Sequence, residues 1–274
     1  MHRKALALLM VLLIAGAIAA SQLLAGTDRH GASVRHFTVK SRFAGRSLHE
    51  VGVVPSGAAD GGKRPLLVFL HGRGLKPESL LSDEFYAGLG RLGERAPIVV
   101  ALDGGDHSYW HDRRGGRWGS YVLREAIPQA VRELGADGSR VAIGGISMGG
   151  YGAFELAREA RRGRFCAVGG HSPAFWLSAG QTAPGAFDDA ADFDRHDVYG
   201  YVRTHARPYG STPLWIDRGT RDPFGPYDAS IVHELRRHGA RLQSHVSPGA
   251  HTGSYWRAHM GRYLRFYADA LARC

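Results

Sequence analysis

From residue 34 onward, short apolar runs alternate with amphipathic stretches, and this alternation restricts the fold more than any other feature. Eight runs have the length and composition of strands, at 34–40, 49–54, 66–70, 98–102, 141–145, 166–169, 214–217 and 242–246. Helical periodicity occupies the intervals at 77–92, 121–134, 148–162, 227–238 and 254–271. Strands that alternate with helices predict an α/β fold, in which a mostly parallel sheet is covered by helices on both faces.

Length and composition indicate one globular domain and exclude several other classes. The 274 residues contain no internal repeat, and 44% hydrophobic with 22% charged residues exclude a disordered or polytopic membrane chain. The net charge of +10 comes from 35 lysines and arginines, of which only four are lysines. Because the arginines are scattered and match no nucleic-acid-binding module, we predict no nucleic-acid partner. A basic surface of this kind favours attraction to anionic envelope polymers or lipids.

Residues 1–26 have the layout of an export signal. A short positive region is followed by an uncharged apolar stretch at 5–20. Ala17 and Ala19 offer a site for signal cleavage, whereas Leu23 and Leu24 extend the apolar stretch enough for an uncleaved membrane anchor. We therefore expect a secreted or cell-envelope protein, with membrane attachment through this segment as the alternative to cleavage.

The chain has two cysteines, and export would place them in an oxidising compartment. Cys166 and Cys274 could then form a disulfide, which closes a long loop and stabilises the fold. Alternatively, Cys166 is a buried thiol within an apolar run and Cys274, the last residue, is mobile. The sequence leaves both interpretations open.

A glycine-rich motif connects the strand at 141–145 to the helix at 148–162. In Gly145-Ile146-Ser147-Met148-Gly149, the glycines permit a tight turn that holds the serine in a strained conformation at the top of the sheet. We predict Ser147 as a nucleophile. The backbone N–H of Met148, at the positive end of the helix, is predicted to stabilise an oxyanion.

A second oxyanion donor is expected from the loop His71-Gly72-Arg73-Gly74, which directly follows the strand at 66–70. We predict that the backbone N–H of Arg73 supplies it and that Gly72 contacts substrate. His71 is interpreted as a residue that braces this loop. The Arg73 guanidinium is also suited to a substrate carboxylate or phosphate, although the sequence does not decide this.

The serine needs a histidine base, and the sequence contains 15 histidines. His251 lies in a turn after the strand at 242–246, so we expect it at the same carboxyl edge of the sheet as Ser147. His245 lies inside that strand and His259 in the following helix, and both are interpreted as structural. We therefore predict His251 as the base.

A carboxylate must orient the imidazole. Asp222 follows the strand at 214–217, and Pro223 favours an extended backbone at that turn, so Asp222 is predicted to reach His251. Asp217, the competing candidate, ends the strand and is interpreted as a brace for the loop. The resulting order of serine, aspartate and histidine along the chain is the order found in α/β hydrolases.

Four motifs together resemble the putative-esterase family of α/β hydrolases, which includes esterase D-type S-formylglutathione hydrolases and the secreted mycolyltransferases. They are HGRG, GISMGGYGA, GTRDPF and GAHTGSYW, and the resemblance spans about residues 34–271. The resemblance implies an α/β-hydrolase fold, a Ser-His-Asp triad and no cofactor. It does not imply a particular substrate.

Two further segments bear on the substrate site that this resemblance implies. Residues 103–112 contain two histidines and three carboxylates that could hold a divalent ion. The resemblance instead places this loop beside the active site, so we favour no metal and expect Tyr109 and Trp110 to wall the substrate pocket. Residues 171–213 interrupt the strand–helix rhythm and are expected to form a small helical cap, with a disordered insertion as the alternative.

The resulting prediction is an exported serine carboxylesterase with a catalytic domain at 34–274, which acts on a small-molecule, lipid or polysaccharide ester through a Ser147 acyl-enzyme. Two alternatives remain: an acyltransferase that acts on envelope sugars or lipids, and a non-catalytic binding module on the same fold.

Overall fold

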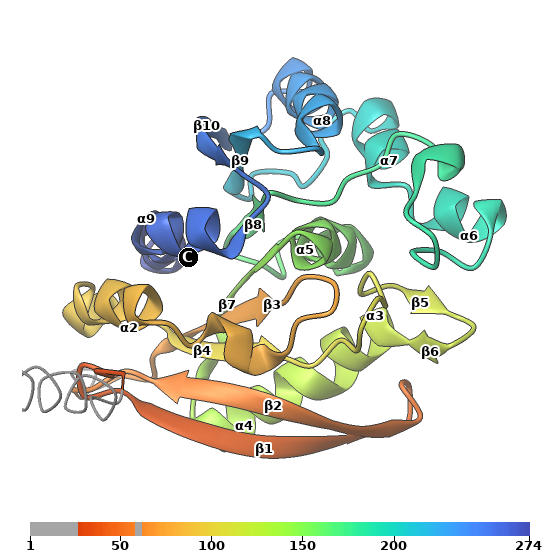
Figure 1. The fold of residues 1–274 in the computed structure, drawn as a ribbon. Helices are drawn as coiled ribbons and strands as arrows, with labels where there is room; N and C mark the ends of the chain where they lie inside the picture. Colours follow the sequence, from red (N-terminus) through yellow and green to blue (C-terminus); the bar gives the residue numbers. More distant parts are fainter. Residues whose placement is uncertain (1–26, 58–61) are drawn as a thin grey trace, which may run out of the picture.

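The computed structural model describes residues 27–57 and 62–274, and the expected signal or anchor at 1–26 lies outside this range. Eight strands form one sheet in the order β1-β2-β4-β3-β7-β8-β9-β10 (Figure 1). The strands are β1 (Ser33–Ser41), β2 (Arg46–Val54), β3 (Pro65–Leu70), β4 (Ile98–Leu102), β7 (Asp137–Ile146), β8 (Val168–His171), β9 (Leu214–Arg221) and β10 (Leu242–Ala250).

The sheet is mostly parallel, as predicted. β1 pairs antiparallel with β2, and β2 pairs antiparallel with β4, whereas all remaining neighbours are parallel. The parallel strands β3 and β4 are buried almost throughout, because helices cover both of their faces. The carboxyl ends of β3, β4, β7, β8, β9 and β10 therefore lie along one edge of the sheet.

Helices cover the two faces of the sheet with separate hydrophobic clusters. α2 (Asp83–Gly90) and α9 (Gly253–Leu271) pack on one face with Leu67 and Phe69, which alternate along β3 with residues of the opposite cluster. On the other face lie α3 (Trp118–Tyr121), the π-helical turn η3 (Val122–Ala126), α4 (Ile127–Leu134), α5 (Met148–Glu159) and α8 (Gly225–Arg237). Within the described ranges, no helix combines the length and apolar character that crossing a bilayer requires.

Two expected helices differ in detail. The stretch expected at 77–92 begins with the 3-10 turn η1 (Pro77–Leu80), and α2 starts only at Asp83. Ser82 caps the start of α2, because its side chain accepts a hydrogen bond from the Phe85 N–H. The 3-10 turn η2 (Gly93–Arg95) follows α2. The stretch at 121–134 is divided by η3 immediately before Pro128, which cannot donate a hydrogen bond to the preceding turn.

The segment 171–213 is folded throughout. It contains the 3-10 turn η4 (Ala179–Gln181) and the short helices α6 (Ala190–Arg195) and α7 (Val198–Thr204). Phe187, Phe193 and Val202 are buried in the same cluster as α5. Apolar packing of this kind explains why the segment is ordered, and its expected part in shaping a substrate entrance stays a prediction.

Cys166 and Cys274 form a disulfide, with their Cα atoms 5.7 Å apart. The bridge joins the end of the chain, after α9, to the segment that leads into β8. The sequence left open a disulfide or two free thiols, and the structure contains the disulfide.

Reduction of this disulfide is expected to lower the free energy of unfolding by about 4–5 kcal/mol, because the bridge closes a loop of 108 residues in the unfolded chain. Urea unfolding with and without dithiothreitol measures the difference. The Cys166→Ser/Cys274→Ser double variant is the control and should show the same loss with no response to the reductant. Equal stability of the oxidised and reduced wild type would contradict the prediction.

Candidate active site

Ser147 lies in the turn between β7 and α5 with a strained backbone. Its φ of 55° and ψ of −115° are unusual for a residue with a side chain. A Cβ atom on Gly149 would lie 2.0 Å from the Leu70 carbonyl oxygen, and one on Gly145 would lie 2.5 Å from the same atom. Glycine is therefore required at both positions, and this close approach to β3 places Ser147 at the carboxyl edge of the sheet.

Ser147, His251 and Asp222 form a continuous chain of hydrogen bonds. The Nε2 atom of His251 lies 2.9 Å from Ser147 Oγ, and its Nδ1 atom lies 3.0 Å from Asp222 Oδ2. Asp222 is positioned by the Phe224 N–H, which donates to its Oδ1 atom at 2.9 Å. The structure thus brings together the three side chains that the sequence placed at one edge of the sheet, as a serine, a base and an orienting carboxylate.

The environment of Asp222 keeps it ionised. Burial acts to raise its pKa, but the His251 ring and the Phe224 N–H outweigh burial and hold the pKa of Asp222 below its usual range. An ionised Asp222 favours the histidine tautomer that carries its proton on Nδ1. That tautomer leaves Nε2 free to accept the Ser147 hydroxyl proton.

Asp217, the competing carboxylate, has a different set of partners. Its Oδ1 atom lies 2.9 Å from His171 Nδ1 and accepts from the Trp215 indole at 2.8 Å. Its Oδ2 atom accepts from the hydroxyls of Tyr255 and Tyr263 at 3.0 and 2.8 Å. Asp217 is thus a buried junction between β8, β9 and α9, and none of these partners belongs to the Ser147–His251 pair.

Two aromatic residues flank His251 and were not singled out from the sequence. The ring centroids of Phe224 and Trp256 each lie 5.1 Å from that of His251, and the Trp256 ring is nearly perpendicular to the imidazole. Phe224 ends the motif GTRDPF and Trp256 ends the motif GAHTGSYW, which are two of the four motifs that resemble the esterase family. Proximity to the predicted aspartate and histidine was therefore the only sequence signal that could have found them.

The loop after β3 lies against Ser147. A Cβ atom on Gly72 would lie 3.4 Å from Ser147 Cβ, so the backbone passes directly beside the serine. Met148 opens α5, where the first N–H groups of a helix have no carbonyl partner in a preceding turn. The loop and the helix start therefore both lie at Ser147, and the oxyanion role of the Arg73 and Met148 N–H groups stays a prediction.

His71 joins two loops at this edge. It is buried, with Nδ1 lying 2.8 Å from the Gly72 carbonyl and Nε2 accepting from the Gly104 N–H at 2.9 Å. Burial lowers the pKa of His71 and keeps the ring neutral. These contacts are those of a bracing residue, which is the role that the sequence suggested.

Tyr109 lies beside the exposed Arg73. Only 3% of Tyr109 is exposed, and its ring packs edge-on against Tyr151 of α5. Burial raises the pKa of Tyr109, while the adjacent Arg73 guanidinium acts in the opposite direction. Tyr109 therefore lies beside the Arg73 guanidinium, and direct contact of Tyr109 with substrate stays a prediction.

The structure corrects the expectation for Trp110. Its side chain is completely buried and leaves no surface for a substrate. Cβ atoms on Gly104 or Gly152 would lie 2.5 Å from its ring, so both glycines exist to accommodate the indole between the 103–112 loop and α5. Trp110 is a core residue of this loop rather than a wall of the pocket.

The titratable residues of 103–112 point to different partners. Asp103 lies near His71, and Asp106 lies near Lys76. Asp112, at the start of the hairpin formed by β5 (Asp112–Arg113) and β6 (Gly116–Arg117), accepts hydrogen bonds from Ser120. The segment therefore does not form a single cluster of ligands.

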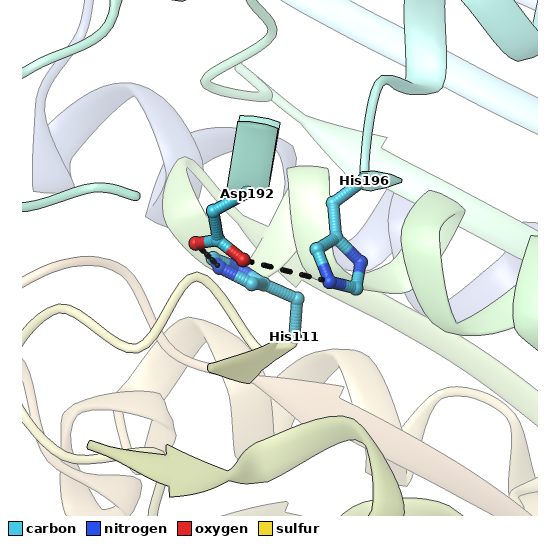
Figure 2. A group of neighbouring side chains, drawn as sticks. All are labelled: His111, Asp192 and His196. Atoms are coloured by element: carbon cyan, nitrogen blue, oxygen red, sulfur yellow. Dashed lines mark hydrogen bonds and ion pairs between the residues drawn. The ribbon is translucent and has the colours of Figure 1, made fainter. Parts of the chain in front are cut away.

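His111 instead meets two residues of the segment 171–213. Figure 2 shows His111, Asp192 of α6 and His196 converging, and we call these residues the His–Asp–His cluster. His111 Nε2 lies 3.1 Å from Asp192 Oδ2, and His196 Nδ1 lies 2.6 Å from Glu155 of α5. The cluster thus joins α6, α5 and the 103–112 loop inside the protein.

The ligand atoms of the His–Asp–His cluster lie within 4.8 Å of one another, which is a spacing that a metal ion could use. Both neighbouring carboxylates are, however, already paired with arginine. Asp192 accepts from Arg195 at 2.9 Å, and Glu155 accepts from Arg158 at 2.7 Å. The arginine ion pairs balance the charge of the buried carboxylates without a metal ion. We therefore assign the cluster a role in holding the segment 171–213 against the core.

Glu50 of β2 is buried beneath the 103–112 loop. It accepts hydrogen bonds from the Asp103 N–H at 2.7 Å and from the Tyr121 hydroxyl. Burial raises the pKa of Glu50 to about 8, despite these hydrogen bonds. The folded protein therefore keeps a proton that the unfolded chain releases between pH 4.5 and 8, and stability falls as the pH rises through this window.

Between pH 5 and 8, the free energy of unfolding of the wild type is expected to fall by about 3 kcal/mol more than that of Glu50→Gln, which cannot titrate at this position. Urea unfolding of both proteins at several pH values measures this difference. The comparison cancels the contributions of other titrating groups. Parallel pH profiles for the two proteins would show that Glu50 does not carry the effect.

A largely apolar pocket of about 200 Å³ includes neighbours of the triad in its lining, although no triad residue lines it. Its lining includes Phe69, Leu75, Leu80, Ile146, Trp256 and Met260. Two of these residues are neighbours of the triad, because Ile146 precedes the serine in the sequence and the centroid of the Trp256 ring lies 5.1 Å from that of His251. Pockets for drug-sized ligands measure about 300–1,000 Å³, so this one suits a short acyl chain or a single ring.

The sheet order, the serine turn and the position of the three side chains define an α/β hydrolase. The chain belongs to the family described as "Putative esterase", whose model matches residues 45–267. Membership of this family supports an esterase or related hydrolase activity.

Solved structures show the same fold. A ferulic acid esterase aligns with a TM-score of 0.75 at 20% identity and covers 87% of this chain and 98% of its own. An S-formylglutathione hydrolase from Agrobacterium tumefaciens aligns with a TM-score of 0.75 at 19% identity, covering 88% and 96%. A fluorophosphonate-binding serine hydrolase, FphF, from Staphylococcus aureus aligns with a TM-score of 0.71 at 18% identity, covering 86% and 98%. No curated protein matches the sequence.

Proposed function

We propose that this protein is an exported serine carboxylesterase. The observation that carries the proposal is the hydrogen-bond chain from Ser147 Oγ through both nitrogens of His251 to Asp222. A serine in this arrangement loses its proton to the imidazole as it attacks a carbonyl carbon. Membership of the esterase family supports a carboxylic ester as the substrate.

In the proposed reaction, Ser147 Oγ bonds to the ester carbon while His251 Nε2 accepts the hydroxyl proton. Asp222 balances the charge of the resulting imidazolium. The backbone N–H groups of Arg73 and Met148 stabilise the oxyanion. Collapse of this intermediate breaks the bond to the alcohol oxygen, which takes the proton from His251, and water then releases the acid from Ser147 by the same steps.

The pocket beside the triad supports small ester substrates. We expect kcat/KM for p-nitrophenyl esters to be highest for short acyl chains and to fall steeply from octanoate to palmitate, because about 200 Å³ does not hold a long chain. Met260 is buried at this pocket and contacts none of the triad. Met260→Ala should therefore raise the octanoate-to-acetate ratio of kcat/KM by roughly tenfold. An unchanged ratio would place the acyl group elsewhere.

The same assays separate the proposal from its rivals. Labelling of Ser147 by a fluorophosphonate, with labelling absent in Ser147→Ala, would exclude a non-catalytic binding module. Product analysis in the presence of a polyol separates hydrolysis from acyl transfer. Free acid as the main product supports the esterase, whereas predominant acylated polyol would make the protein a transferase.

A further inference from the structure

A cavity of about 600 Å³ lies away from the triad and is lined by several arginines. Arg262, Arg265 and Arg273 come from α9 and the residues after it, and Arg241 comes from the start of β10. We call this cavity the arginine groove. It lies at the amino ends of β9 and β10, whereas Ser147 lies at the carboxyl edge of the sheet.

The guanidinium groups of the arginine groove have no carboxylate partner in the described part of the chain. Asp269 is the acidic residue in the lining, and it is paired with Arg95 at 2.7 Å. Arg241 reaches a backbone carbonyl, and Arg262 lies 6.0 Å from the centre of the Trp215 ring. Four unneutralised cations around one cavity repel one another, so an anionic ligand would stabilise the arrangement.

The groove is held in place by the fold. Arg262 and Arg265 are three residues apart on α9 and lie on one face of that helix, and Arg273, after the helix, directly precedes Cys274 of the disulfide. The disulfide therefore prevents the last turn of α9 from moving away from the groove. His245 and Trp215 also line the groove, with their ring centroids 4.3 Å apart.

The start of the described chain lies on the same edge of the sheet. Ser33 of β1 pairs with Val54, at the end of β2, and β2 in turn pairs beside the start of β4. The beginning of β1 and the end of α9 thus lie on one side of the molecule (Figure 1). In the sequence, the apolar stretch 5–20 ends 13 residues before Ser33. The arginine groove therefore lies on the side of the domain from which the segment 1–26 leaves it.

We infer that the arginine groove binds the phosphate groups of anionic phospholipids, so that this edge of the sheet lies on a membrane and the triad faces away from it. A single apolar segment leaves the orientation of a domain free, whereas a second, electrostatic contact across the sheet restricts it. The inference concerns orientation and does not depend on which ester is cleaved.

Vesicle co-sedimentation of the full chain tests the inference. The wild type should bind vesicles with 30% phosphatidylglycerol far more tightly than phosphatidylcholine vesicles, and 0.5 M salt should remove the difference. Arg262→Gln/Arg265→Gln/Arg273→Gln should weaken binding to the anionic vesicles by about 100-fold, at roughly one kcal/mol per arginine near the surface. Binding to neutral vesicles should not change, because it reports the apolar segment alone.

A matched control separates the groove from net charge. Arg42→Gln/Arg46→Gln/Arg124→Gln also removes three exposed arginines, but the β1–β2 turn that carries two of them lies at the opposite edge of the sheet. This variant should lose less than about threefold in binding, because the Debye length is only about 10 Å. Equal losses in the two triple variants would overturn the inference.

Two further outcomes would also overturn it. Equal binding of the wild type to anionic and neutral vesicles would mean that only the apolar segment binds. Titration with inorganic phosphate tests whether the groove binds free phosphate instead of a lipid headgroup. Micromolar affinity for free phosphate would make the groove a site for a soluble ligand. Both triple variants should remain folded by circular dichroism and keep the ester hydrolysis of the wild type, since none of these residues contacts the triad.

Discussion

Replacement of Ser147 by alanine is expected to lower kcat/KM for a short p-nitrophenyl ester by about 10⁵-fold without unfolding the protein. The hydroxyl oxygen forms the bond to the acyl carbon, and within residues 27–57 and 62–274 Ser147 is the one side chain hydrogen-bonded to the Nε2 atom of His251. Circular dichroism and the unfolding midpoint should match the wild type. A variant that keeps more than about 1% of wild-type turnover would contradict the assignment.

Ser147→Gly provides a control that separates chemistry from folding. Because Ser147 has a φ of 55°, glycine relieves backbone strain and should raise the free energy of unfolding by about 1 kcal/mol, while activity is lost as in the alanine variant. Urea unfolding measures this gain. An inactive variant that is more stable than the wild type would show that the strained turn serves catalysis at a cost in stability.

Asp222→Asn is expected to lower kcat by about 10³- to 10⁴-fold. The asparagine amide cannot balance the charge of the imidazolium, and it favours the tautomer of His251 that cannot accept the serine proton at Nε2. The fold should persist, because the Phe224 N–H retains an oxygen acceptor in one amide orientation. Steady-state kinetics together with fluorophosphonate labelling rates would measure the loss.

Asp217→Asn should show the opposite pattern. Its carboxylate accepts four side-chain hydrogen bonds inside the protein, so an amide that accepts only through one oxygen would destabilise the fold by about 2–4 kcal/mol. The kcat of the folded fraction should change by less than tenfold, since Asp217 does not contact His251. A severe loss of kcat in Asp217→Asn with normal stability would mean that Asp217, and not Asp222, is the catalytic carboxylate.

Local rules accounted for the parts of this structure that depend on neighbours in sequence. The apolar run at 141–145 followed by a glycine-rich turn predicted β7, the start of α5 and the placement of Ser147 at the carboxyl edge. Likewise, the turn after β9 distinguished Asp222 from Asp217, because only a residue beyond the strand can reach across to the neighbouring loop. Backbone sterics and strand direction operate over a few residues, and a sequence records both.

Tertiary packing decided the features for which the sequence carried no local signal. Trp110 was expected to face substrate, yet Gly104 and Gly152, which are distant from each other in sequence, leave space for its ring in the core. His111 belongs to a cluster completed 81 and 85 residues later by Asp192 and His196. Neither partner differs in its local pattern from an exposed polar residue.

The sequence by itself determined the α/β fold, the edge of the sheet that carries the site, and the serine, aspartate and histidine that meet there. Only the tertiary structure decided that Cys166 pairs with Cys274, that Phe224 and Trp256 flank His251, and that four arginines surround one groove. The physical reason is the range of the interactions. Turn geometry and strand direction are set within a few residues, whereas side-chain contacts depend on how distant segments pack, which local patterns do not encode.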